Sequence, residues 1–148
     1  METQSGDLYH KLILEHNRAP LYFEKRPDAM RVVDATNPLC GDKFKIFMDI
    51  ENQTIVRATF HGYGCAVSKA SASVLMQKIQ GRPVAEALTL VRAFLTRINP
   101  ASHDAQPPAP PDEETKAFLP VKNYPGRLKC ATLAWEALEA DIKDLQPA

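Results

Sequence analysis

Residues 43–61 read KFKIFMDIENQTIVRATFH, and this stretch decides the fold. Its first half alternates apolar positions with mainly charged ones, a period of two that is typical of a half-buried β-strand. Asn52 and Gln53 interrupt the alternation and favour a turn. A second run of β-branched and apolar residues follows at 55–61. The stretch therefore predicts two antiparallel strands joined by a short turn.

The second of these strands has an apolar face of its own. Alternation places Val56, Ala58 and Phe60 together on that face. Residues 31–36 form a weaker candidate for a further strand just before the first. Three consecutive strands with short connections predict an antiparallel meander.

Helical periodicity surrounds the predicted sheet. The first helix is expected to be capped by Ser5 and to stop at 17–20. Gly81 is the expected left-handed cap of a second helix, and Pro83 the opening residue of a third. Prolines are dense at 101–112, which predicts a loop at about 100–120. The helices expected after the sheet span 65–80, 83–98 and 126–145.

Composition bounds the class of protein. A chain of 148 residues buries roughly two-thirds of its unfolded surface, enough for a single domain that spans 1–148. Eighteen Lys plus Arg balance 18 Asp plus Glu, which argues against nucleic acid and a membrane surface as partners. No apolar run is long enough to span a bilayer. We therefore expect a cytoplasmic protein that acts with a protein partner or a small substrate.

Three cysteines, Cys40, Cys65 and Cys130, carry most of the functional information. An odd number without a secretory signal argues against a disulfide framework. Each lies at the boundary of an expected element, and Cys40 shares a Pro- and Gly-containing turn with Asp42. Cys65 falls at the start of a helix, where free amides and the helix dipole favour a thiolate.

These residues leave three kinds of chemistry open. Three thiolates and one carboxylate suit tetrahedral zinc, which accepts both sulfur and oxygen. Three thiolates alone also suit an iron–sulfur cluster. Because the chain has no Cys-x-x-Cys pair, the thiols are equally compatible with a role as small buried apolar groups.

Three cysteine-containing segments carry a family resemblance. They read NPLCGD at 37–42, GYGCAVSKAS at 62–71 and RLKCATLAW at 127–135. Together they resemble the IscU/NifU-like family of iron–sulfur cluster assembly proteins, and its SufU branch in particular. The N-terminal residues, LY at 8–9 and ILEH at 13–16, are also similar to the first helix of that family. The resemblance covers nearly the whole chain, in order.

The resemblance implies an α+β fold in which helices pack on a three-stranded antiparallel sheet. It implies zinc bound by Cys40, Asp42, Cys65 and Cys130. In SufU-like proteins a histidine of the partner takes over one zinc position and frees the thiolate that matches Cys40. The implied activity is that of a zinc-dependent sulfurtransferase, which accepts persulfide sulfur from a SufS-like cysteine desulfurase. Downstream iron–sulfur assembly proteins are further partners that the resemblance implies.

One position distinguishes the branches of this family. Classical IscU scaffolds carry a histidine immediately before the third cysteine, whereas Lys129 stands there in this chain. The difference favours the SufU branch. The alternative is a scaffold that assembles a [2Fe–2S] cluster on Cys40, Cys65 and Cys130. A purely structural zinc module is a third interpretation.

Two further residues are weighed as catalytic groups. Arg127 lies one turn before Cys130 and is a candidate for stabilising a thiolate or persulfide anion, or for anchoring a partner's carboxylate. The alternative for Arg127 is an ordinary solvated helix residue. His61 is close to Cys65, as in a nucleophilic Cys–His pair. No hydrolase signature accompanies it, so we expect a surface histidine at a strand end.

Overall fold

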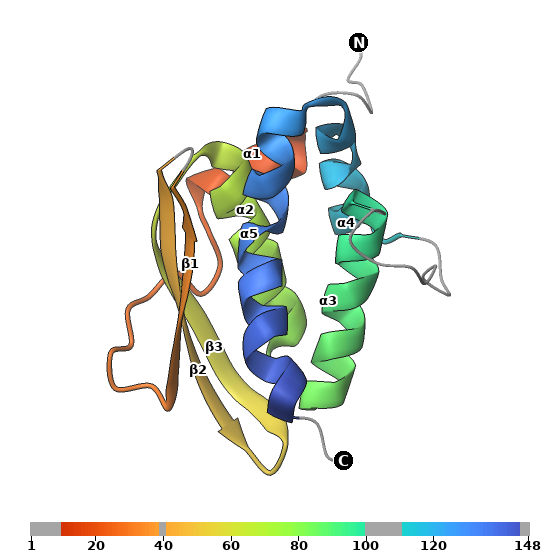
Figure 1. The fold of residues 1–148 in the computed structure, drawn as a ribbon. Coiled ribbons are helices and arrows are strands. Elements are labelled where there is room, and N and C mark those ends of the chain that lie inside the picture. The colour runs from red at the N-terminus through yellow and green to blue at the C-terminus, as the bar shows by residue number, and fades with distance from the viewer. Residues whose placement is uncertain (1–9, 39–40, 100–110, 146–148) are drawn as a thin grey trace.

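The structure is a computed structural model that describes residues 10–38, 41–99 and 111–145. In this part of the chain, helices cover one face of a three-stranded sheet (Figure 1). No described helix is both long enough and apolar enough to cross a membrane. The elements are α1 (Lys11–Arg18), β1 (Arg31–Asn37), β2 (Asp42–Glu51), β3 (Thr54–Tyr63), α2 (Ala66–Ile79), α3 (Val84–Ile98), α4 (Glu113–Phe118), η2 (Leu119–Asn123), α5 (Pro125–Ile142) and η3 (Lys143–Leu145).

The sheet is an antiparallel meander in the order β1-β2-β3. β2 is central, and its Phe44 pairs with Ala35 of β1 and with Gly62 of β3. Asn52 and Gln53 have positive φ angles of 51° and 62°. Two such residues in succession form a hairpin turn whose twist matches that of the strands. The strands and the turn predicted from the alternation are confirmed.

One side-chain orientation predicted for β3 is wrong. Val56 is 45% exposed, whereas Ile55 beside it is fully buried. The register between β2 and β3 shifts between Asp49 and Ile50, and Val56 is left without a partner in β2. Such a β-bulge shifts the alternation by one residue, so side chains at the start of β3 point to the opposite face from the one that simple alternation assigns. Ile55 therefore occupies the core position that simple alternation assigns to Val56.

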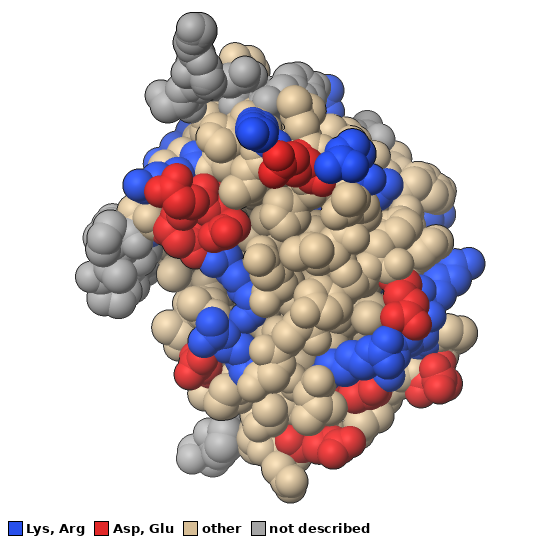
Figure 2. Space-filling model, turned by 180° about the vertical axis from the view of Figure 1, so that it is seen from behind, with Lys and Arg blue, Asp and Glu red and all other residues tan. Residues whose placement is uncertain are grey.

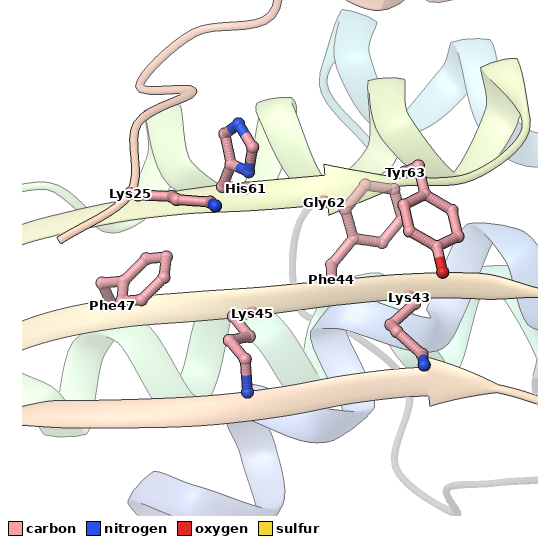
Figure 3. Close-up of a pocket in the computed structure, with 8 residues that line it drawn as sticks. All are labelled: Lys25, Lys43, Phe44, Lys45, Phe47, His61, Gly62 and Tyr63. Atoms are coloured by element: carbon pink, nitrogen blue, oxygen red, sulfur yellow. The ribbon is translucent and has the colours of Figure 1, made fainter. Parts of the chain in front are cut away.

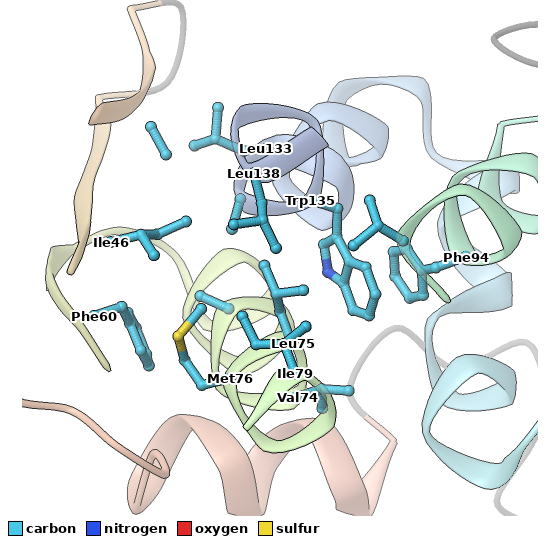
Figure 4. Packing of buried hydrophobic residues seen from close by; sticks show 14 of the residues in the cluster. Ile46, Phe60, Val74, Leu75, Met76, Ile79, Phe94, Leu133, Trp135 and Leu138 are labelled. Atoms are coloured by element: carbon cyan, nitrogen blue, oxygen red, sulfur yellow. The ribbon is translucent and has the colours of Figure 1, made fainter. Parts of the chain in front are cut away.

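The helices form layers on the inner face of the sheet. α2 contacts β3, α5 contacts β1, and the two helices pack on each other, with α3 against α5 (Figure 1). Trp135 of α5 stacks on Phe94 of α3 with 3.7 Å between ring centroids. Its indole N–H donates to Ser71 Oγ of α2 at 2.8 Å. Figure 4 shows how side chains from the sheet and three helices meet in one core, among them Ile46, Phe60, Leu75, Met76, Phe94, Trp135 and Leu138.

The ends of the early helices agree with the sequence signals, with one exception. Gly81 follows α2 with a φ of 71°, and Pro83 is the N-cap of α3. α1 begins after His10, whose Nδ1 accepts a hydrogen bond from the Leu12 amide at 3.1 Å. The expectation that Ser5 caps this helix is therefore wrong, and Ser5 itself lies outside the described residues.

The expected loop at about 100–120 is shorter than predicted. Residues 100–110 lie outside the described part of the chain, and α4 begins at Glu113. Its N-cap is Asp112, whose carboxylate accepts from the Thr115 amide at 2.9 Å. Phe118 of α4 and Val121 of η2 are buried in the core. The segment after the prolines is therefore packed structure.

Candidate metal centre

Three groups able to bind a metal meet although they come from distant parts of the chain. Asp42 is the first residue of β2, Cys65 is the N-cap of α2, and Cys130 lies in the second turn of α5. Their ligand atoms all lie within 4.8 Å of one another. Asp42 and Cys130 are buried, and Cys65 is half-buried. A carboxylate and two thiols thus form a compact cluster at the start of β2.

Two glycines let the connection between β3 and α2 pass close to Asp42. Gly62 has a φ of 145°, and a Cβ at this position would lie 2.2 Å from the carbonyl oxygen of Lys43. A Cβ on Gly64 would lie 2.7 Å from Asp42 Oδ1. With glycine at position 64, Asp42 Oδ1 accepts a hydrogen bond from the Cys65 amide at 3.0 Å. The GYG segment therefore allows the backbone of Cys65 to contact the carboxylate.

The sulfur of Cys65 is hydrogen-bonded to Ser68 at the N-terminus of α2. It accepts from the Ser68 amide at 3.5 Å, and its S–H donates to the Ser68 hydroxyl at 3.6 Å. The same buried hydroxyl donates to the Cys65 carbonyl at 3.1 Å. Amides and the dipole at a helix N-terminus stabilise negative charge. The sulfur of Cys65 is therefore held at the start of α2, close to Asp42 and Cys130.

Cys130 lies in the opposite kind of environment. Burial raises the pKa of its thiol far above the usual thiol range, and the neighbouring Cys65 and Asp42 raise it further. Acidic groups this close repel one another when they ionise. A divalent cation removes that repulsion and stabilises the thiolates. Two sulfurs and a carboxylate oxygen form a donor set that fits zinc, which binds both kinds of atom.

The structure brings together three of the four ligands expected from the sequence. Cys40, the fourth, lies outside the described residues and two positions before Asp42 in the sequence. Arg127 is half-buried in the first turn of α5, one turn before Cys130. The roles of Cys40 and Arg127 therefore stay predictions. Asp42, Cys65 and Cys130 form the part of the candidate metal centre that the structure describes.

His61 and Lys129, both singled out in the sequence, contact residues outside the ligand cluster. His61 is half-buried, and its ring stacks on Phe23 with 4.5 Å between centroids. Lys129, which replaces the histidine of classical scaffolds, is exposed and forms an ion pair with Glu136. A lysine ammonium has no lone pair to offer a metal. Within the described residues, the metal-binding group contains no histidine.

Sequence reasoning missed the residues that support the ligands. Gly64 and Ser68 shape the surroundings of Cys65, and the Ser71–Trp135 hydrogen bond joins the two helices that carry the cysteines. The role of Ser68 has a readable signal, because an N-cap side chain commonly pairs with the amide three residues later. The contact of Ser71 with Trp135 joins residues 64 positions apart and has no local signal.

Comparison with known proteins identifies the family. Residues 8–108 match the family model described as NifU-like N terminal domain. The chain belongs to the NifU-like N-terminal domain family. The matched residues include Asp42 and Cys65, whereas Cys130 lies beyond them.

Curated relatives of this NifU-like chain carry two kinds of name. The chain is 33% identical, over 91% of its length and 89% of the relative, to the zinc-dependent sulfurtransferase SufU of Bacillus subtilis. It is 31% identical, over 95% of its length and 86% of the relative, to the iron–sulfur cluster assembly scaffold protein IscU of Streptococcus pyogenes serotype M1. The resemblance to the IscU/NifU-like family, including SufU, is confirmed.

Solved structures agree with this assignment. A putative iron–sulfur cluster assembly scaffold protein for the SUF system, from Fervidobacterium islandicum AW-1, matches with a TM-score of 0.77 at 29% identity, covering 90% of this chain and 95% of that one. The N-terminal part of a NifU-like protein from Brucella abortus matches with a TM-score of 0.79 at 21% identity, covering 93% and 94%. The second likeness shows the fold alone. The predicted α+β fold with a three-stranded antiparallel sheet is confirmed.

Proposed function

We propose that this NifU-like chain is a zinc-dependent sulfurtransferase, which accepts persulfide sulfur from a cysteine desulfurase and passes it toward iron–sulfur cluster assembly. The observation that carries the proposal is the convergence of the Asp42 carboxylate with the Cys65 and Cys130 thiols within 4.8 Å. The name of the Bacillus subtilis relative supports the same activity.

The proposal divides the cysteines into two roles. Cys65 is the N-cap of α2, and Cys130 lies in the second turn of α5. Together with Asp42, these two cysteines retain the metal. Cys40 completes the ligand set and is the sulfur acceptor. Zinc, when bound, keeps thiolates deprotonated and masks them until one is released. The centre therefore both stabilises the fold and controls when the acceptor thiolate is available.

The proposed transfer is a thiolate–persulfide exchange. The Cys40 thiolate attacks the terminal sulfur of a persulfide on the donor's cysteine. A sulfur–sulfur bond forms on Cys40 while that of the donor breaks, and the electron pair leaves with the donor's thiolate. The exchange needs no oxidant or reductant. Arg127, one turn before Cys130, is proposed to stabilise the anionic persulfide.

A scaffold for a [2Fe–2S] cluster is the second candidate. The IscU relative of Streptococcus pyogenes supports it. Lys129 weighs against it, because its ammonium forms an ion pair with Glu136 and offers no lone pair to iron. The two candidates differ in the metal that they bind and in colour.

Metal analysis combined with a desulfurase assay tests the proposal. Protein purified without air should be colourless, contain about one zinc per chain, and accelerate sulfur release from cysteine by a cysteine desulfurase. A brown protein whose iron and sulfide disappear together in Cys65→Ser and Cys130→Ser would support the scaffold instead. A zinc protein that leaves the desulfurase unaffected would point to a purely structural zinc module.

A further inference from the structure

The outer face of the sheet, away from the helices, carries a groove that the proposed chemistry does not use. Its volume is about 270 Å³. Figure 3 shows side chains of β2 and β3 around it, together with Lys25 from the segment that precedes β1. We call it the sheet groove and define it by Lys25, Lys43, Phe47, His61 and Tyr63.

Positive charge frames the sheet groove. Lys43 and Lys45 are two residues apart in β2 and therefore project from the same face. Lys45 forms an ion pair with Asp34 at 2.6 Å. Among the residues that the structure describes, neither Lys25 nor Lys43 has an ion-pair partner. The groove thus holds two uncompensated cations in a chain whose net charge is zero.

The face of the molecule seen in Figure 2 is different. There, Lys and Arg side chains lie next to Asp and Glu side chains around a largely uncharged centre. Ion pairs such as Arg82–Glu86 and Arg92–Glu139 show the same mutual neutralisation. Unpaired lysines beside aromatic rings therefore set the sheet groove apart from surfaces where charges are paired.

The floor of the groove between the two lysines is apolar. Phe47 is only 4% exposed although it belongs to the outer face of β2. The segment before β1 crosses this face, and its Arg26 forms an ion pair with Asp49. Tyr63 is 62% exposed. Figure 3 shows Lys25 near the Phe47 end and Lys43 with Tyr63 at the opposite end.

One end of the sheet groove lies at the same end of the sheet as the metal centre, on the opposite face. Lys43 directly follows Asp42 and pairs across the sheet with Tyr63. Tyr63 in turn precedes Cys65 by two residues. A molecule bound along the groove would therefore reach the same end of the sheet as the ligand cluster, on the opposite face, without occupying the cluster.

We propose that the sheet groove docks an acidic segment of the sulfur-donating partner protein, an inference that rests on the proposed function. Two carboxylates meet Lys25 and Lys43, and an apolar side chain between them packs on the exposed ring of Tyr63, above the floor that Phe47 forms. Alternate residues of an extended chain lie about 6–7 Å apart, so an extended segment can present separated carboxylates to cations at both ends. Complementary charge also accelerates encounter between the partners.

A charge-reversal pair tests the docking. Lys25→Glu/Lys43→Glu is compared with Lys122→Glu/Lys143→Glu, which changes the net charge equally at exposed lysines outside the groove. Each zinc-loaded protein is titrated with the cysteine desulfurase, and zinc content and thermal unfolding check its fold. We expect the groove pair to raise Kd about tenfold or more and the control pair to leave it unchanged. Added salt should weaken wild-type binding more than binding by the groove pair.

The outcomes separate the groove from the proposed function. Equal Kd values for the two pairs, with sulfur transfer intact, would overturn the groove alone. A wild-type chain that neither binds the desulfurase nor accepts sulfur would overturn the proposed function.

The groove is then judged by NMR titration of the zinc-loaded chain with the capped peptide Glu-Leu-Glu, with Lys-Leu-Lys as control and pyrophosphate as a compact anion. Shifts at Lys43 and Tyr63 with the acidic peptide alone support it, and binding of pyrophosphate alone overturns it.

Discussion

Two buried regions connect α2 to α5, and they are held together in opposite ways. In the first, Trp135 donates to Ser71, and apolar side chains surround the pair. In the second, Asp42, Cys65 and Cys130 converge, and their ionised forms repel one another. The first region satisfies its own polar groups, whereas the second is built from groups that a bound cation would hold together. Under the proposed function, the chain therefore combines a core that is independent of metal with a centre that depends on it.

This difference separates two contributions to stability. Packing around Trp135 should contribute to the free energy of unfolding in the metal-free protein as much as in the zinc-loaded one. The proposed ligand cluster should contribute only when zinc couples its binding free energy to folding. Measurements made with and without a chelator therefore distinguish the two regions.

The largest effect is expected for Cys65→Ser. Serine is a good N-cap, so α2 keeps a hydrogen bond at its start while the sulfur ligand is lost. Zinc content should fall to near zero. The chelator-sensitive part of the free energy of unfolding, about 3–4 kcal/mol when zinc is 100–1,000 times its Kd, should disappear. Denaturant unfolding with and without chelator measures it, and a variant as chelator-sensitive as wild type would refute the role of Cys65.

A smaller and metal-independent effect is expected for Trp135→Phe. The substitution removes the indole N–H that donates to Ser71 and part of the stacking on Phe94. The loss should be about 1–3 kcal/mol. Because this region satisfies its own groups, the loss should be the same with zinc and with chelator. If the chelator abolished it, the two regions would not be independent.

The contribution of Asp42 is expected to appear in transfer more than in stability. Asp42→Ala removes a hard ligand and the acceptor of the Cys65 amide. Sulfur transfer should slow about tenfold, because ligand exchange is disturbed while the sulfur ligands still hold zinc. Asp42→Asn restores a hydrogen-bond acceptor without the charge and is the matched control. An alanine variant with full zinc and full activity would exclude Asp42 as a working ligand.

The smallest effect is a dependence on pH in the metal-free protein. Burial raises the Cys130 pKa above the ordinary thiol value of 9.0, which the unfolded chain retains. The unfolded state therefore loses its proton first as pH rises. Stability contributed by the neutral thiol is complete below about pH 9 and then falls by at most about 1.4 kcal/mol per pH unit. Unfolding of the chelated protein should show this slope, and Cys130→Ala should abolish it. Persistence of the slope in Cys130→Ala would assign it to another group.

The sheet and most helices could be predicted because their signals are local. Alternation reveals β2, and the expected turn at Asn52 and Gln53 is present. Val56 escaped prediction because a bulge changes the side-chain period without changing the composition. α4 was missed because it is short and follows a proline-rich stretch, so only its packing against the core supports it.

The candidate site required more than local signals. Cys65 and Cys130 are 65 positions apart, and no spacing rule says that they meet. Their convergence depends on α2 packing against α5, which burial of both helices provides. The family resemblance supplied the expectation, and the geometry brings Cys65, Cys130 and Asp42 together. Cys40 stays a prediction because it lies outside the described residues.

Mass spectrometry after mixing the zinc-loaded chain with a cysteine desulfurase and cysteine tests whether the acceptor and the metal-holding thiols are distinct. We expect the added mass of one sulfur atom on the peptide that contains Cys40. The addition should be absent in Cys40→Ser even where zinc and fold survive. Added sulfur that maps to Cys130 and is absent from Cys40 would contradict the proposed division of roles and favour chemistry in which the last cysteine is the acceptor.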